Sequence, residues 1–471
     1  MAHALKLSLP VFRLPQSYKF WLLVCFLAFV FLTGGSSRHD SQSLVMLRPV
    51  AVIVCGIALA SLSVKDVRAH RVIFLLAAGV FLLVLVHLVP LPPSLWQTLP
   101  GRDVLVEVDR VAGIRDQWRP VAMVPSLAWN ALYALFVPLA VLLLGAQLVP
   151  EERLRLLPVI LGLGLFSGFW GLMQIVGAPD GPLYLHRHTT PGAAVGLFAN
   201  RNHQAALLSC LFPILATFAS FGARSEEQAK VRFWLAVAAG TFLVPLIIVT
   251  GSRAGLATGL LGLGFGLWLY QKPKLSVPAK RAVRRFNPRL LLVSMGILIV
   301  VALTVIMARA EAFRRLLAAD QTEDLRLQMW APIAGMAAKY FPVGSGIGSF
   351  VPVYQVDEPA ALLGLSYVNH AHNDWLETWL TAGIPGLLLI TLAVFAYLRG
   401  SYAAFTGPPA DTRGIAYARL GSAIIFIFAL ASVVDYPFRV PSIACLGVVA
   451  MLWLDRKTTP EPEKAGRRDI L

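Results

Sequence analysis

The stretch WLETWLTAGIPGLLLITLAVFAYL, residues 375–398, decides the fold class of this chain. It carries no charge after Glu377, and about 20 apolar residues let a helix cross a ~30 Å hydrocarbon core. Similar runs recur along the 471 residues, of which 57% are hydrophobic and only 14% are charged. This composition excludes a soluble fold of one to three domains. The sequence therefore predicts an all-α polytopic membrane protein.

We expect one polytopic membrane domain over residues 1–471. Its twelve spans are predicted near 20–35, 49–64, 72–90, 127–148, 156–177, 203–222, 233–250, 254–270, 290–308, 376–398, 415–434 and 438–454. The first run is interpreted as a signal anchor, because no small-residue cleavage site follows it. The four cysteines all lie in such runs, which argues against a disulfide framework.

The net charge of +16 suggests nucleic-acid binding, but the distribution of the charges contradicts it. Most lysines and arginines fall in the segments that share a side with both termini, so the positive-inside rule places both termini in the cytoplasm. Residues 455–471 are then a cytoplasmic tail. Residues 309–375 form a large outer loop with amphipathic helices, and no nucleic-acid partner is expected.

Arg253 lies in IIVTGSRAGLATGLLG (247–262), between two apolar runs. An arginine at membrane depth costs about 2.5–3.5 kcal/mol on insertion scales, so it needs a partner or a function. A helical hairpin at Gly251–Ser252 puts Arg253 at the outer end of the second helix. There the helix amides and the guanidinium together make an anion site. The alternative is an interfacial arginine that reaches the headgroup level.

The stretch EDLRLQMWAPIAGMAAKYFPVGSGIGSF (323–350) presents Arg326 on an outer amphipathic helix, as a second candidate phosphate ligand. Its GSGIGS run lacks the Lys-Ser/Thr of a P-loop and follows no strand, which argues against a nucleotide site. We interpret it as a turn that folds the loop back onto the membrane.

Polar residues open the span that follows GLFANRNHQAALLSCLFP (196–213). Asn200, Asn202 and His203 are expected chiefly to cap this helix, with ligand contact as the alternative. Arg201 in the same stretch is a supporting candidate for the site.

The motif HAHNDWLE (370–377) allows three interpretations. On a strand, His370, His372 and Asp374 would share one face and bind a metal. The motif enters a helix, however, where Asp374 and Glu377 are spaced as a capping box. That leaves His372 as a candidate general base at the outer membrane face, with Asn373, Asp374 and His370 as supporting candidates.

Downstream of that motif, GIPG (383–386) predicts a kink beside a cavity, compensated by neighbouring helices.

Together these stretches resemble the bacterial O-antigen ligase and polymerase superfamily of membrane glycosyltransferases. His372-Asn373, nine residues and then GIPG is similar to the family element His-[Asn/Ser/Gln]-x9-Gly-x-x-Gly. GSRAG, DLRLQMW, PVGSGIGSF, GLFANRNH and LPPSLWQTLPG (91–101) are also similar to family patterns. The resemblance covers about residues 90–450 and is strongest over 320–390. Leu387 departs from the ligase pattern, which often has threonine there.

The resemblance implies a GT-C-like enzyme of the bacterial inner membrane whose site faces the periplasm. It would transfer a glycan from undecaprenyl diphosphate to an acceptor hydroxyl, without metal or cofactor and with inversion. The family's key residues carry over to His372 as base and to Arg253 and Arg326 as diphosphate ligands. Its partners would be the lipid-linked glycan, the lipid bilayer and a chain-length regulator.

The acceptor stays open among the lipid A core, a second lipid-linked glycan and a protein. A flippase or transporter of lipid-linked intermediates is the main alternative. It is disfavoured because the ionisable candidates lie at span ends and no internal repeat is evident. A metal-dependent hydrolase is the third reading.

Overall fold

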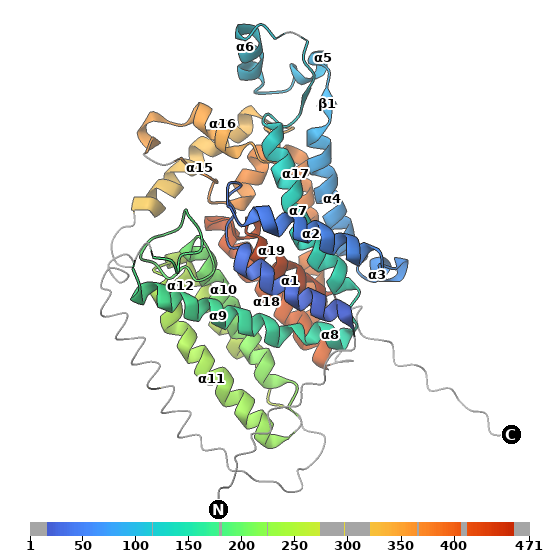
Figure 1. Ribbon diagram of the computed structural model, residues 1–471, viewed down its shortest axis with the longest axis vertical. Coiled ribbons are helices and arrows are strands. Elements are labelled where there is room, and N and C mark those ends of the chain that lie inside the picture. Colours follow the sequence, from blue (N-terminus) through green and yellow to red (C-terminus); the bar gives the residue numbers. More distant parts are fainter. Residues whose placement is uncertain are drawn as a thin grey trace, which may run out of the picture.

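The computed structural model describes residues 17–114, 116–178, 181–223, 225–273, 296, 321–364, 367–406 and 412–455. Within these residues the chain is almost entirely helical (Figure 1). The long apolar helices are α1 (Tyr18–Thr33), α2 (Leu44–Leu59), α4 (Arg71–Leu88), α7 (Pro125–Ala146), α9 (Leu156–Val176), α10 (Arg201–Ser220), α11 (Glu226–Val249), α12 (Arg253–Leu269), α17 (Asp374–Thr406), α18 (Thr412–Val434) and α19 (Pro441–Leu454).

These helices make the chain a polytopic membrane protein. In the described part of the chain, seven are long and apolar enough to cross a membrane, and α1, α2, α12 and α19 are shorter apolar helices. Each of the eleven coincides with one predicted span. The remaining prediction, 290–308, lies outside the described residues apart from residue 296, so a total of twelve stays a prediction.

Shorter elements lie between the long helices. They are α3 (Val64–Ala69), β1 (Pro90–Leu91), α5 (Pro93–Trp96), α6 (Asp103–Val111), β2 (Arg119–Pro120), α8 (Pro150–Leu154), α15 (Gln321–Lys339), α16 (Phe350–Asp357), η1 (Ala360–Leu362) and η2 (Pro437–Arg439). Strands β1 and β2 pair antiparallel. Helices α5, α6, α15 and α16 gather at one end of the molecule (Figure 1). Helices α15 and α16 both lie within residues 309–375, the segment predicted as the large outer loop.

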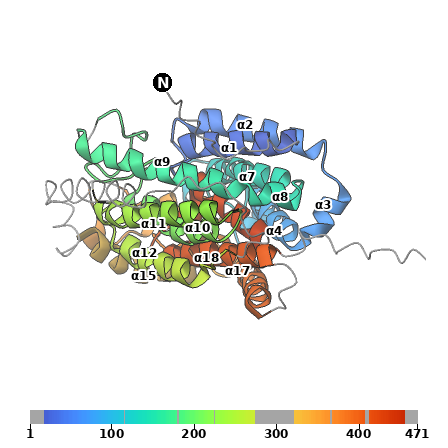
Figure 2. The same ribbon diagram turned by 90° about the horizontal axis from the view of Figure 1, so that it is seen from below.

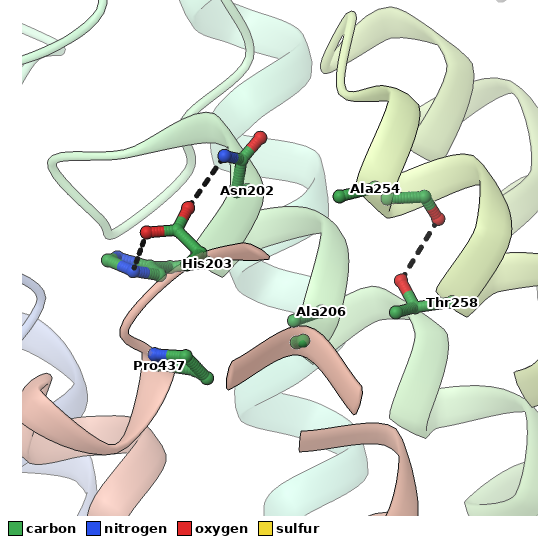
Figure 3. A pocket seen from close by; sticks show the side chains of 9 residues that line it. Asn202, His203, Ala206, Ala254, Thr258 and Pro437 are labelled. Carbon is green, nitrogen blue, oxygen red and sulfur yellow. Dashed lines mark hydrogen bonds and ion pairs between the residues drawn. The ribbon is translucent and has the colours of Figure 1, made fainter. Parts of the chain in front are cut away.

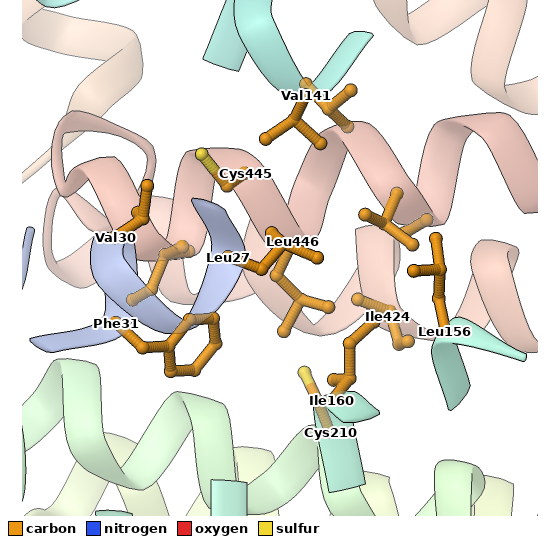
Figure 4. Close-up of a cluster of buried hydrophobic side chains, with 14 of the residues drawn as sticks. Leu27, Val30, Phe31, Val141, Leu156, Ile160, Cys210, Ile424, Cys445 and Leu446 are labelled. Atoms are coloured by element: carbon orange, nitrogen blue, oxygen red, sulfur yellow. The ribbon is translucent and has the colours of Figure 1, made fainter. Parts of the chain in front are cut away.

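Helix α10 lies inside the bundle, with α1 and α2 at one edge and α7 and α9 between (Figure 2). Nearly all of its side chains are buried. Helix α12 approaches α10 so closely at Gly262 that a Cβ on this residue would lie 2.2 Å from the carbonyl oxygen of Ser209. Only glycine fits at this contact. Apolar side chains of α1, α7, α9, α10, α18 and α19 fill the main core, among them Phe31, Ile160 and Leu446 (Figure 4).

Backbone hydrogen bonds join segments that are distant in sequence at one end of the bundle. The backbone nitrogen of Ser442 donates to the carbonyl oxygen of Gly34 at 3.1 Å, and that of Ala199 donates to Gly35 at 3.0 Å. At the opposite end, Arg153 lies 2.7 Å from His70. Residues 34, 35, 199 and 442 therefore lie at one end of the bundle, and residues 70 and 153 lie at the other.

Helix α17 is broken at Gly383, whose φ of 54° lies in the left-handed region. The predicted kink at GIPG is confirmed, but a loop compensates for it where neighbouring helices were expected. In the glycine-rich run, the backbone nitrogen of Ser345 donates to the carbonyl oxygen of Leu380 and that of Gly346 donates to Thr381, at 2.9 Å each. In return, the nitrogen of Ile384 donates to the carbonyl oxygen of Pro342 at 2.8 Å.

This loop also fills the space beside the kink, where a cavity was expected, because a Cβ on Gly383 would lie 2.1 Å from the carbonyl oxygen of Pro342. The predicted folding back of GSGIGS onto the membrane helices is confirmed.

Candidate active site

The loop before α17 holds His372 in an uncommon backbone conformation. Its φ is 49°, in the left-handed region that residues other than glycine rarely adopt. Such a conformation costs about 1–3 kcal/mol and persists where the surroundings fix it, often at functional sites. The side chain of His372 is 14% exposed, so solvent or a ligand still reaches it.

Asp435 is the centre of the polar cluster around His372. It follows α18 directly and is buried. Its Oδ1 lies 3.4 Å from Nδ1 of His372 and 3.6 Å from Nε2 of His203. Burial opposes ionisation of this carboxyl, but the two imidazoles hold its pKa well below the ordinary value. Asp435 is therefore a carboxylate placed between two histidines.

Asn202 connects this carboxylate to the start of α12. Its Nδ2 donates to Asp435 at 2.6 Å, and its Oδ1 accepts from Oγ of Ser252 at 2.7 Å. Ser252 also caps α12, since its Oγ accepts from the nitrogen of Gly255 at 2.8 Å. A continuous chain of contacts thus runs from His372 to the helix end where Arg253 stands. Figure 3 shows Asn202 and His203 together at the beginning of α10.

A small pocket lies beside these residues (Figure 3). Its polar lining consists of Asn202, His203, Asp435 and Thr258. The remaining lining residues are small or apolar: Ala206, Ala254, Gly255, Ala431 and Pro437. The pocket therefore lies between α10, α12 and α18, and one carboxylate and one imidazole are among its four polar lining residues.

Tyr436 packs its ring among three imidazoles. Its centroid lies 4.3 Å from that of His370, 4.9 Å from His372 and 5.1 Å from His203. Burial raises the pKa of Tyr436 to about 12, with Asp435 adding to the effect, so the phenol stays neutral. Tyr436 thereby fixes the ring planes of the histidines without adding charge.

The pKa of His372 is lowered from its ordinary value. Burial is the main cause and the positive charge of Arg326 adds to it, while Asp435 opposes the shift. His372 is therefore neutral near pH 7. Its Nδ1 faces Asp435, so Nε2 is the nitrogen left to accept a proton.

A second cluster lies on the other side of the same loop. Nε of Arg439 donates to Asp374 at 2.8 Å, and its NH1 group lies 3.0 Å from Glu377. Nδ1 of His370 lies 3.1 Å from Glu377. The attraction of the two carboxylates overcomes burial and raises the pKa of Arg439, which stays charged.

The predicted capping box is wrong. Asn373 caps α17, because its Oδ1 accepts from the nitrogen of Leu376 at 3.0 Å. Asp374 instead accepts hydrogen bonds from Arg439 and Ser432. Because Asn373 already caps the helix, the carboxylate of Asp374 is left to pair with the guanidinium of Arg439. Glu377 reaches back to the nitrogen of Ala371 at 2.9 Å. The expectation for α10 is confirmed in part, since Asn200 caps it while Asn202 and His203 face Asp435.

The three predicted arginines stand on three different helices, α12, α15 and α10. Arg253 is the first residue of α12, as the hairpin prediction requires, next to the pocket residue Ala254. Arg326 stands on α15. Its positive charge adds to the lowering of the pKa of His372 and opposes the rise in the pKa of Tyr436. Arg201 is buried in the first turn of α10.

The alternating histidines do not converge on one point. His370 faces Glu377 and His372 faces Asp435. Across the described ranges, no group of three or more histidine, cysteine, aspartate or glutamate residues is arranged to hold a metal ion.

The sequence reading missed Asp435, Tyr436 and Arg439. Asp435 and Tyr436 lie between the runs predicted as the last two spans, and Arg439 lies at the beginning of the last run. The available signal was an aspartate immediately after a long apolar run, where a charge is costly unless it is paired.

Fold and site together define a polytopic helical membrane protein that gathers histidines and carboxylates at one end. Residues 238–391 match the family model described as O-antigen ligase, which supports the resemblance to the O-antigen ligase/polymerase superfamily. The matched segment contains Arg253, Arg326 and His372. No curated protein matches the chain.

Proposed function

We propose that this protein transfers a glycan from undecaprenyl diphosphate to an acceptor hydroxyl at the periplasmic face of the bacterial inner membrane. The observation that carries the proposal is the family match over the segment that holds His372, Arg253 and Arg326. The contact between His372 and a buried carboxylate supports it. In this orientation both termini are cytoplasmic, and the end of the bundle that bears the site faces outward.

In the proposed reaction His372 is the general base. A sugar hydroxyl is a weak nucleophile, and a base within hydrogen-bond reach contributes about 10²–10⁴-fold. His372 accepts the hydroxyl proton at Nε2, and Asp435 stabilises the resulting imidazolium from the Nδ1 side. Asp435 is a positioning residue, because it acts through His372.

Arg253 and Arg326 bind the diphosphate in this proposal. The leaving diphosphate gains negative charge as the glycosidic bond breaks, and guanidinium groups bind phosphate oxygens bidentately. The two arginines stand on different helices, α12 and α15. Three neighbouring residues have a supporting role in this proposal. Asn373 and His370 flank His372 in the sequence, and Arg201 precedes Asn202.

Direct displacement inverts the anomeric carbon, and the carboxylates near His372 support that outcome. Asp374 and Glu377 are engaged by Arg439, and Asp435 accepts from Asn202 and Tyr436. Because these three carboxylates already have partners, we do not assign any of them as a covalent nucleophile.

The acceptor is either the lipid A core, a second lipid-linked glycan or a protein. A polymerase would use a second lipid-linked repeat and work with a chain-length regulator. A ligase would use the lipid A core.

Reconstitution with a lipid-linked repeat and each candidate acceptor tests the proposal. We expect transfer that persists in EDTA and is lost in His372→Ala, with Phe395→Leu on the exposed part of α17 as a control that keeps it. In cells, short lipid-linked repeats accumulating in His372→Ala would indicate a polymerase, and full-length lipid-linked polymer a ligase. Accumulation on the cytoplasmic leaflet would contradict the proposal and indicate a flippase.

A further inference from the structure

His203 is a buried imidazole that the proposed reaction does not yet use. It is 2% exposed, and neither of its ring nitrogens has a hydrogen-bond partner among the residues that the structure describes. The rings of Phe198 and Tyr436 flank it, with centroids at 6.4 Å and 5.1 Å. An unsatisfied buried polar group costs about 1–3 kcal/mol, so its position requires a reason.

The nearest charge to His203 offers that reason. Nε2 of His203 lies 3.6 Å from Oδ1 of Asp435, and Nδ1 of His372 lies 3.4 Å from the same oxygen. Two imidazoles therefore compete for one carboxylate oxygen. Both distances are longer than a hydrogen bond, so neither histidine forms a short hydrogen bond with Oδ1 of Asp435.

We propose that His203 shares Asp435 with His372 and, as a positioning residue, sets the proton affinity of His372. A positive charge at the position of His203 would neutralise much of the field of Asp435 and leave His372 a neutral base. The inference rests on the proposed function, since it assigns His372 the role of base.

The other groups around this trio are limited. Besides Asp435, His372 experiences the charges of Arg326 and His370, while Tyr436 is a neutral phenol. From α12, the pocket lining beside His203 is Ala254, Gly255 and Thr258, and from α18 it is Ala431 (Figure 3). No lining residue from α12 or α18 titrates, and Arg253 and Arg201 are the charged residues adjacent in sequence to this region.

Two substitutions with opposite charge separate this role from packing. His203→Gln is neutral, so Asp435 acts on His372 alone and raises its pKa. We expect the acid limb of the pH–rate profile to move to higher pH by about one unit. His203→Lys keeps a positive charge beside Asp435, and its acid limb should stay at the wild-type position. Phe198→Leu changes the packing of His203 without changing charge and should also leave the acid limb in place.

Histidine NMR in nanodiscs supplies a readout that does not depend on turnover. The His372 signal, assigned by its absence in His372→Ala, should titrate at higher pH in His203→Gln than in wild type. If it titrates at the same pH, or if the lysine variant shifts as the glutamine variant does, the inference is overturned. Should wild type show no glycan transfer, the proposed function fails, whereas this titration still tests the coupling. If His203→Gln does not fold, His203→Asn serves the same comparison.

Discussion

His370 and His372 are separated by one residue, yet they lie in opposite settings. Around His370, Glu377, Arg439 and Asp374 pair opposite charges at 2.8–3.1 Å. Around His372, the contacts to the shared carboxylate lengthen to 3.4 Å and 3.6 Å, and within the described residues Nδ1 of His372 and both ring nitrogens of His203 have no hydrogen-bond partner.

The difference separates two uses of buried charge. In the Arg439 cluster every charge has a close partner, and moving a proton would leave an unpaired ion. In the Asp435 cluster one carboxylate serves two imidazoles, so a proton can be gained or lost at modest cost. We therefore assign stability to the first cluster and proton transfer to the second.

The largest expected effect is on the His372 side. His372→Ala should lower the rate of glycan transfer by about 10²–10⁴-fold, because the acceptor hydroxyl loses its base. Initial rates in proteoliposomes, together with an unchanged unfolding temperature, measure this. His370→Gln is the matched control, and an equal loss of rate there would remove the distinction between the two histidines.

Arg439→Met tests the opposite cluster and should act on stability. Glu377, which is 2% exposed, would keep its charge and lose its guanidinium partner. Removing one member of a buried pair costs about 3–5 kcal/mol, and we expect the lower end because the side chain of Arg439 is 29% exposed. Thermal unfolding in detergent measures the loss, with Arg439→Lys as the charge-preserving control. An inactive variant with unchanged stability would instead assign this cluster to the chemistry.

Asp435→Asn tests the Asp435 cluster through the pH dependence of the transfer rate. Asp435 raises the proton affinity of His372, so its removal leaves burial and Arg326 to lower the pKa of His372 further. The acid limb of the pH–rate profile should move to lower pH by about one unit. The rate above pH 7 should also fall, because the imidazolium loses its partner. A shift to higher pH would contradict the assigned geometry.

Arg326→Gln should give a smaller shift of the opposite sign. Arg326 lowers the pKa of His372, so the neutral variant should move the acid limb to higher pH by less than about one unit. Its KM for the lipid-linked donor should rise as well, if Arg326 binds the diphosphate. Arg326→Lys keeps the charge and should retain the wild-type acid limb.

The sequence predicted the helices well because hydropathy is a local signal. Each described long helix matches one expected run, and His372, Arg253 and Arg326 followed from motifs. Asp435 could not be found in this way. It meets Asn202 across 233 residues of sequence, and only packing of α10 against α18 brings them together.

The capping box failed for a related reason. Local spacing favours Asp374 and Glu377 as caps, but it does not reveal Arg439, which lies 65 residues further along the chain. Where a distant guanidinium competes with a local amide for a carboxylate, the tertiary partner decides the geometry.

The hydrogen bonds between residues 342–346 and the kink of α17 have a consequence for biosynthesis. Pro385 cannot donate to Thr381 and the kink frees the amide of Ile384, so α17 enters lipid with polar groups that cost several kcal/mol if unmet. The segment that meets them precedes α17 in the chain and leaves the ribosome first. A circular permutation that places residues 342–346 after α17 should therefore lower the yield of inserted protein, even with every native contact available at the end.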